Sequence, residues 1–186
     1  MREPAYTRLD VDERRRSLLE HGAELFALHS YDELSMAGLA RAAGVSKALL
    51  YHYFPSKQAY FSAVLMGGAA ELASAVPADA PPAEQLDAFL RWIERRGAAY
   101  ATFVRGAAPE VREVTELIRG HTAERIFAVL GGEPTPERRT AVTAWLWFMD
   151  GAIVDWVEHA DLTREALRDL LLRTLEGALG EPLSPA

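Results

Sequence analysis

The stretch SMAGLARAAGVSKALLYHYFPSK, residues 35–57, decides the fold of this chain. Ser35 can cap a short helix that carries apolar residues at three- and four-residue spacing. Gly44 can adopt the left-handed backbone conformation that reverses a chain after a helix, and Ser46 can cap the next helix. The stretch therefore predicts two short helices joined by a tight turn, a helix-turn-helix.

The second of these helices, predicted over residues 47–54, divides its side chains between two faces. Leu50 and Phe54 lie four residues apart and share the face that can pack inward. Pro55 ends the helix, and Ser56 can cap a third one. The remaining side chains of the second helix are thus left to face outward, toward a groove that could accept them.

This pattern resembles the signature of the TetR family of bacterial transcriptional regulators. The resemblance covers residues roughly 10–65 and is carried by Leu39-Ala40, Ala43-Gly44-Val45-Ser46, Leu50-Tyr51-His52-Tyr53-Phe54 and Ser56-Lys57. It implies an all-α fold of about nine helices, with a three-helix DNA-binding head and a larger helical body for ligand binding and dimerisation. We expect the head to span residues 1–57 and the body residues 58–186.

The resemblance implies that the second helix enters the major groove of DNA. Lys47 and His52 can donate to guanine or to a phosphate, and the apolar side chains of Ala48 and Leu49 can contact a thymine methyl group. The family pattern assigns Tyr51 to a phosphate, and Lys57 lies at a helix start, where backbone N–H groups favour an anion. Leu49 departs from the family pattern, which more often has a small or hydroxyl residue there. The predicted DNA contacts are Ser35, Ser46, Lys47, Ala48, Leu49, Tyr51, His52 and Lys57.

The composition excludes several classes of site. The chain has 186 residues and no cysteine, which excludes disulfides, thiol nucleophiles and thiolate metal sites. Its five histidines show no metal-ligand spacing, and the sequence has neither a nucleophile elbow nor a glycine-rich phosphate loop. It also lacks an apolar run of about 18 residues and a signal peptide. We therefore expect a cytoplasmic protein with no membrane segment, no metal, no cofactor and no enzymatic activity.

The charges are distributed unevenly along the chain. The net charge is −7, yet residues 1–60 carry eight basic and eight acidic side chains, against twelve and nineteen in residues 61–186. The only two lysines, Lys47 and Lys57, both lie in the helix-turn-helix stretch. The negative charge thus belongs to the body, and DNA binding would depend on a locally neutral head.

Helical periodicity extends over the rest of the chain. A loose arm at residues 1–9 precedes a helix to about residue 30, and its expected inward residues are Leu18, Gly22, Leu25, Phe26 and His29. A helix over residues 57–75, with a bend allowed at Gly67-Gly68, leads to a proline-rich break at residues 76–82. Further helices are predicted over residues 83–106, 109–120, 121–130, 137–159 and 164–179.

Two sets of body residues are candidates for binding. The resemblance implies an apolar ligand pocket, for which the candidates are Trp92, Tyr100, Phe103, Phe127, Trp145, Phe148 and Met149. It also implies that the last two helices pack against their copies in a homodimer, with Gly151, Ala152, Asp155, Leu167, Leu170, Leu171 and Thr174 at the interface. Asp150 interrupts an apolar helix and must be paired or hydrogen-bonded, most simply with an arginine across the dimer.

The sequence thus predicts a homodimeric transcriptional regulator, by analogy a repressor. It would bind a palindromic double-stranded DNA operator and leave it when a small apolar or amphipathic effector binds the body. Two alternatives stay open. A helical ligand-binding dimer without DNA binding would fail to bind DNA even at low salt, and a protein-binding helical adaptor would hold no cavity.

Overall fold

The computed structural model describes residues 11–76, 80–106 and 108–183. Its helices are α1 (Val11–Leu28), α2 (Met36–Ala42), α3 (Lys47–Tyr53), α4 (Lys57–Ala75), α5 (Pro82–Val104), α6 (Pro109–Leu130), α7 (Pro136–His159) and α8 (Arg164–Leu179). These three ranges contain no strand, and the all-α fold is confirmed. None of the described helices is long and apolar enough to cross a membrane. The arm expected over residues 1–9, and residues 77–79 of the proline-rich break, lie outside the described residues.

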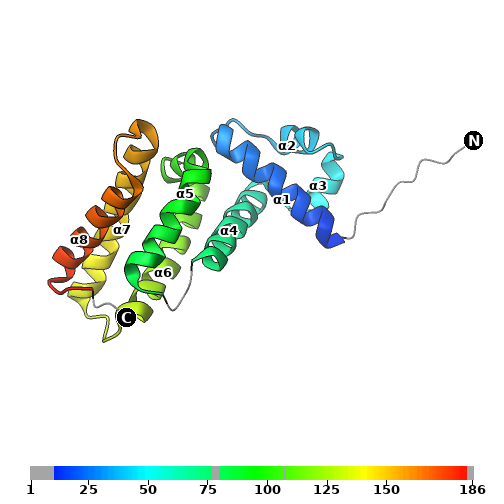
Figure 1. The fold of residues 1–186 in the computed structure, drawn as a ribbon. Helices are drawn as coiled ribbons and strands as arrows, with labels where there is room; N and C mark the ends of the chain where they lie inside the picture. The colour runs from blue at the N-terminus through cyan, green and yellow to red at the C-terminus, as the bar shows by residue number, and fades with distance from the viewer. Residues whose placement is uncertain (1–10, 77–79, 107, 184–186) are drawn as a thin grey trace, which may run out of the picture.

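Helix α4 joins a head to a body (Figure 1). Helices α1, α2 and α3 lie at one end of the molecule and α7 and α8 at the other, with α5 and α6 between them. Helix α4 packs against α1, α5 and α6, so it belongs to both parts. Its N-terminal half joins the buried side chains of α1–α3 and of Val111 in a head cluster. A separate body cluster is built mainly by α5, α7 and α8.

The helix-turn-helix forms as the sequence predicts. The hydroxyl oxygens of Ser35, Ser46 and Ser56 accept hydrogen bonds from backbone N–H groups three residues later, at 3.1, 3.1 and 3.0 Å. Gly44 has a φ of 65° between α2 and α3, a conformation that suits glycine. Leu50 and Phe54 are both buried, so α3 is fixed by one face while its other face stays outside the core.

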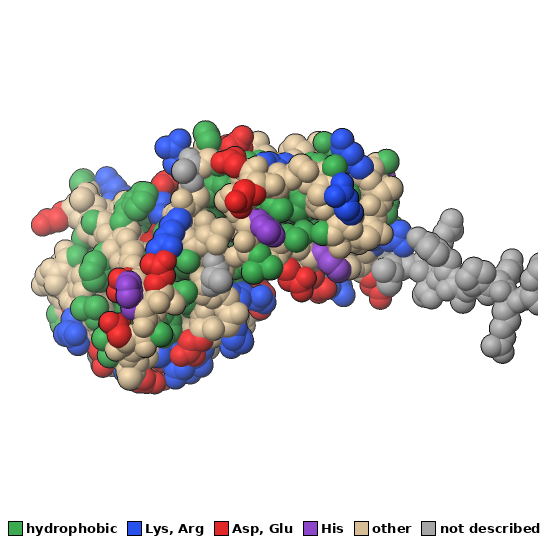
Figure 2. Space-filling view, turned by 90° about the horizontal axis from the view of Figure 1, so that it is seen from above, with side chains coloured by type: hydrophobic (Ala, Val, Ile, Leu, Met, Phe, Trp, Pro, Cys, Tyr) green, Lys and Arg blue, Asp and Glu red, His purple; other side chains and the backbone are tan. Residues whose placement is uncertain are grey.

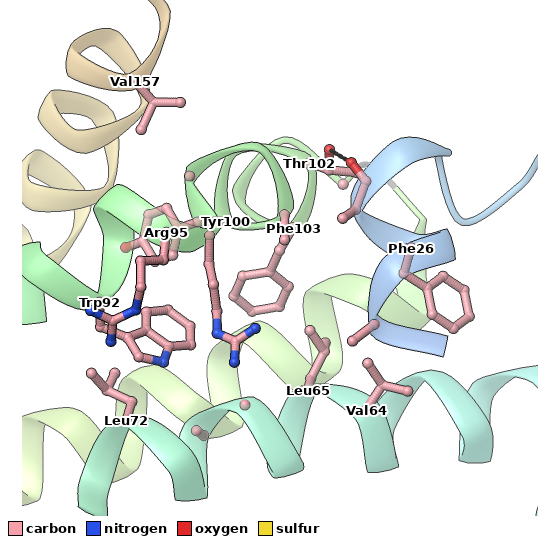
Figure 3. A pocket seen from close by; sticks show the side chains of 18 of the residues that line it. Phe26, Val64, Leu65, Leu72, Trp92, Arg95, Tyr100, Thr102, Phe103 and Val157 are labelled. Atoms are coloured by element: carbon pink, nitrogen blue, oxygen red, sulfur yellow. Dashed lines mark hydrogen bonds between the residues drawn. The ribbon is translucent and has the colours of Figure 1, made fainter. Parts of the chain in front are cut away.

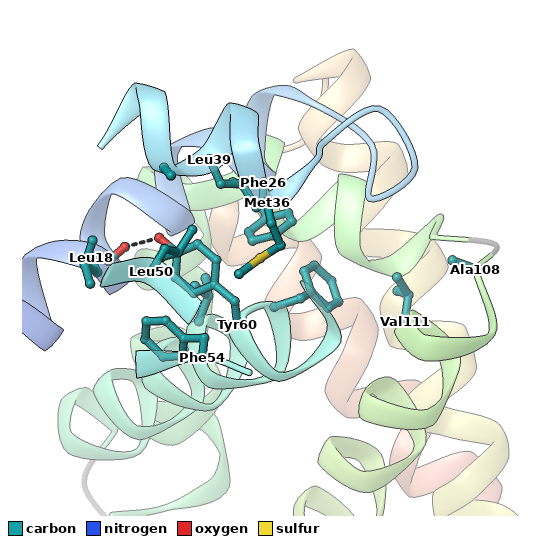
Figure 4. Packing of buried hydrophobic residues seen from close by; sticks show 12 residues of the cluster. Leu18, Phe26, Met36, Leu39, Leu50, Phe54, Tyr60, Ala108 and Val111 are labelled. Carbon is teal, nitrogen blue, oxygen red and sulfur yellow. Dashed lines mark hydrogen bonds between the residues drawn. The ribbon is translucent and has the colours of Figure 1, made fainter. Parts of the chain in front are cut away.

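Tyr60 locks α4 against α1 in the head cluster (Figure 4). Its ring is fully buried beside Phe26 and Phe54, and its hydroxyl donates to the Leu18 carbonyl oxygen. Burial raises the pKa of Tyr60 to about 12, so the hydroxyl remains a donor. Gly22 of α1 makes this contact possible, because a Cβ there would lie 2.7 Å from the Tyr60 hydroxyl oxygen.

Two local expectations are wrong. His29, expected to point inward, is exposed because α1 ends one residue before it. The helix break expected at Gly120 is absent, since α6 is continuous from Pro109 to Leu130. A glycine costs a helix interior only about 1 kcal/mol relative to alanine. The packing of α6 against α4, α5 and α7 outweighs that cost.

Gly22→Ala is expected to destabilise the protein by roughly 1–3 kcal/mol, because the added methyl group overlaps Tyr60 and Val64. Gly120→Ala is the matched control. A Cβ at Gly120 meets no atom within 4 Å, so this change should stabilise the helix by roughly 0.5–1 kcal/mol. Urea unfolding followed by circular dichroism measures both free energies, and effects of the same sign would contradict this account.

Candidate functional site

The outward face of α3 carries most of the residues predicted to contact DNA. Lys47, Ala48, Tyr51 and His52 are exposed, and Leu49 is half-buried. The Lys47 ammonium lies over the Tyr51 ring, 5.6 Å from its centre. The face therefore offers an ammonium, an imidazole and a phenol hydroxyl, all able to donate to phosphate or base oxygens.

Serine and arginine side chains are exposed elsewhere on the head. Ser35 and Ser46 are exposed, and each hydroxyl oxygen caps a helix while its O–H stays able to donate. Arg15, Arg16 and Arg41 are exposed on α1 and α2. Figure 2 shows Lys and Arg side chains over the head end of the molecule, with histidine, apolar and acidic side chains among them. The head thus presents positive groups without a continuous positive patch on this view.

Lys57 does not extend its ammonium outward as expected. Its Nζ donates to the carbonyl oxygens of Tyr31 at 2.9 Å and of Leu34 at 3.1 Å. The same nitrogen lies 4.0 Å from the centre of the Tyr31 ring. These contacts tie the connection between α1 and α2 to the start of α4. The side chain expected to clamp a phosphate therefore holds the head together instead.

A wide groove lies between the head and the body, beside the contact that α1 makes with α5 (Figure 3). It has a volume of about 1480 Å³ and lies between α1, α4, α5 and α7. Three predicted ligand residues, Trp92, Tyr100 and Phe103, line it from α5. Phe103 lies opposite Leu65 of α4, and Trp92 lies opposite Leu72. The Trp92 Nε1 is buried and has no hydrogen-bond partner within the described residues. The groove wall is largely apolar, and charged side chains such as Arg95 also line it.

A smaller, half-open cavity of about 220 Å³ lies in the body, between the C-terminal part of α4 and helices α5–α8. We call it the body cavity. Four predicted ligand residues line it: Tyr100, Phe103, Trp145 and Met149. The other two predictions do not hold. Phe127 is half-buried against the body cluster and lines neither space, and Phe148 faces outward from α7 with 41% of its surface exposed.

A buried polar network crosses the wall of the body cavity. Asp150 is 8% exposed, and its Oδ1 accepts a hydrogen bond from the Tyr100 hydroxyl at 2.5 Å. Its Oδ2 accepts from Arg119 Nε at 2.9 Å and Nη2 at 2.7 Å. Burial and the Asp150 charge raise the pKa of Tyr100 well above its usual range. Arg119 also donates to Glu116 and lies 3.7 Å from the Trp147 ring centre.

The arginine partner of Asp150 is therefore in the same chain, not across a dimer as expected. Arg119 escaped prediction because a helix end at Gly120 would leave it on a turn. In the continuous α6, Thr115, Arg119 and Thr122 follow at four- and three-residue spacing and all line the body cavity. If residues 109–130 had been predicted as one helix, the spacing would have placed these three polar residues on the same face.

The residues predicted for the dimer interface fall into two groups. Leu167 and Leu171 are 1% and 0% exposed and pack in the body cluster, so the prediction that they meet a second subunit is wrong. The other five residues predicted for the interface are at least partly exposed. Gly151 and Asp155 are exposed, and Ala152, Leu170 and Thr174 are half-buried.

Lys57→Met is expected to destabilise the protein by roughly 1–3 kcal/mol, because two partly buried carbonyl oxygens lose their donor while the stem still fills its space. Lys47→Met is the control, since Lys47 is exposed and caps nothing. Urea unfolding should separate the two variants. Equal stability for both would mean that the contacts of Lys57 contribute nothing to folding.

Comparisons with known proteins agree with this geometry. Residues 18–64 match the model of the family described as "Bacterial regulatory proteins, tetR family". A segment of 69 residues is 42% identical to the HTH-type transcriptional activator FasR of Mycolicibacterium smegmatis. That segment is 37% of this chain and 32% of FasR, so the match spans about a third of the relative's length.

Solved structures share the fold over most of the chain. A tetR-family transcriptional regulator from Streptomyces coelicolor has a TM-score of 0.74 at 23% identity, over 92% of this chain and 82% of that one. The Flavonoid-responsive Regulator FrrA has a TM-score of 0.58 at 25% identity, over 91% and 97%. Residues 18–64 therefore carry the helix-turn-helix domain of the TetR family, and the chain shares the fold of a TetR-family regulator over most of its length.

Proposed function

We propose that this chain is a cytoplasmic homodimeric repressor that binds a palindromic DNA operator and leaves it when a small molecule binds the body. The observation that carries the proposal is the exposed donor face of α3, held on a packed head. In this proposal residues 1–57 bind DNA, and residues 58–186 bind the effector and dimerise.

The proposed DNA contacts are of two kinds: contacts to phosphates, which position the head on the duplex, and contacts to bases, which distinguish the sequence. Tyr51, Ser35 and Ser46 are suited to phosphates, since their hydroxyls donate without distinguishing bases. Lys47 and His52 can reach guanine or phosphate acceptors, and Ala48 and Leu49 can meet a thymine methyl. With the Lys57 ammonium held by Tyr31 and Leu34, the start of α4 contributes its backbone N–H groups rather than a side-chain charge.

The exposed face of α7 supports the homodimer. Ala144, Phe148, Gly151 and Asp155 recur at four-, three- and four-residue spacing on the exposed side of this helix. Trp147 beside them is 56% exposed, an unusual amount of apolar ring surface to leave in water. Packing this face against its copy would bury it and set two heads on one duplex.

Helix α4 supports a coupling between effector and operator. Its Leu72, with Val76 just after its end, lines the body cavity, while its Tyr60 fixes the head to it. An effector can shift the spacing of the two heads only if it binds the protein more tightly with α4 in one position than in another. The neighbour FrrA is named flavonoid-responsive, which supports a small-molecule effector.

Activation of transcription is the second candidate function, because the relative FasR is named an activator. A reporter gene under the chain's own upstream DNA distinguishes the two: expression rises on deletion for a repressor and falls for an activator. Gel shifts with the same DNA test operator binding directly. Lack of binding at low salt would instead favour a ligand-binding dimer without DNA contact.

Substitutions on α3 should distinguish residues that recognise bases from residues that bind phosphates. Tyr51→Phe should weaken binding to every DNA sequence, because one phosphate hydrogen bond is lost. Lys47→Ala and His52→Ala should also change the preferred sequence, and Lys47→Ala should lower the salt slope by about 1. Fluorescence anisotropy over a salt series and a set of operator variants measures these effects. Unchanged affinity in all three variants would rule out α3 as the DNA reader.

Phe148→Asp should convert the dimer to monomers, because it places a charge in the proposed apolar interface. Met66→Asp is the matched control, since Met66 is 40% exposed, as Phe148 is at 41%, but lies on α4. Size-exclusion chromatography with light scattering gives the mass of each variant. A dimeric Phe148→Asp protein would show that the subunits meet elsewhere.

A further inference from the structure

One charged side chain on the wall of the body cavity has no partner. Three charged residues line this cavity: the cations Arg119 and Arg125 and the carboxylate of Asp150. Arg119 is paired with Asp150 at 2.7 Å, whereas Arg125 makes no ion pair or hydrogen bond with the described residues. The wall therefore keeps one uncompensated positive charge, although residues 61–186 as a whole carry twelve basic against nineteen acidic side chains.

Arg125 lies at the mouth of the cavity. Of the side chains that line it, those of Arg125 and Val129 are the exposed ones, about one turn apart on α6. Further back along the same helix Thr115 is buried, and Arg119 reaches Asp150 inside the bundle. Thr115 and Arg125 are ten residues apart, which is about 15 Å along the helix axis. The half-open cavity thus runs along α6 from a buried inner end to an exposed cationic rim.

The wall between these two ends is mostly apolar. Leu86 of α5, Ile126 of α6, Leu146 of α7 and Leu175 of α8 all line it. An apolar group placed here leaves water and packs against side chains from four helices. A charged group at the rim would stay partly hydrated beside Arg125, which avoids the cost of burying an ion. The site therefore suits a molecule with one apolar end and one anionic end.

We propose that the body cavity binds an amphipathic carboxylate, with the carboxylate at Arg125 and the apolar chain or ring lying along α6 among the leucines. A guanidinium presents parallel N–H groups that match the two oxygens of a carboxylate. A cationic head group would meet Arg125 with the same charge, and a neutral one would leave the guanidinium without an anion. The inference rests on the proposed function only where it makes this molecule the effector, because binding itself is measured without DNA.

Three probes with the same chain and different head groups test the charge. At pH 7 octanoate is an anion, octylammonium is a cation and 1-octanol is neutral. In calorimetric titrations of the full chain, we expect octanoate to bind at least about fivefold more tightly than octylammonium, the effect of one partly exposed ion pair. Added salt should reduce this preference, because it screens such a pair. Tighter binding of octylammonium, or no binding of octanoate at millimolar concentrations, would overturn the proposal.

Arg125→Gln tests where the head group lies. This change should weaken octanoate binding about fivefold and leave the affinity for 1-octanol unchanged, because only the ion pair is lost. Arg112→Gln is the matched control, since Arg112 is exposed on the same helix and does not line the cavity. It removes the same charge from the protein and should change neither affinity. An unchanged octanoate affinity in Arg125→Gln, or an equal loss in both variants, would show that the carboxylate does not meet Arg125.

Gel shifts with and without octanoate separate this inference from the proposed function. Octanoate binding that depends on Arg125 supports the ligand class even if the operator complex is unaffected, in which case only release from DNA fails. If the chain binds DNA but octanoate binds no better than octylammonium, the ligand class fails and the DNA-binding role stands.

Discussion

The contact between Tyr60 and α1 is the constraint on which the arrangement of this protein depends. The phenol ring fills the space left by Gly22, and its hydroxyl satisfies the Leu18 carbonyl oxygen inside the head cluster. From this fixed point α4 runs on to Leu72 at the wall of the body cavity. One helix therefore belongs to both the head and the cavity.

A second constraint lies in the body, where a carboxylate is kept away from water. An isolated charge in that position would be very costly, and the cost is reduced because Asp150 meets Arg119 and the Tyr100 hydroxyl at once. Each of the three residues comes from a different helix. The network thus fixes how α5, α6 and α7 sit around the cavity.

Much of the head could be predicted from the sequence, because its signals are local. Serine caps at three helix starts and a glycine at the turn act within a few residues, and the structure has each of them in place. The long-range features were harder to predict. Lys57 lies at a helix start, where an anion would be favourable, yet its partners are carbonyl oxygens more than twenty residues earlier. Leu167 and Leu171 have the spacing of an interface stripe, but spacing cannot tell a neighbouring helix from a second subunit.

The linkage of Tyr100, Arg119 and Asp150 also restrains how this sequence can evolve. A change at position 119 alone would leave a buried carboxylate without its counter-charge, and a change at position 150 alone would leave the Arg119 guanidinium with only the exposed Glu116 as its acidic partner. A variant that has lost only one of the two residues would be less stable, and selection would remove it whatever its effect on regulation. Among relatives, positions 119 and 150 should accordingly be inherited as a pair or replaced together by apolar residues.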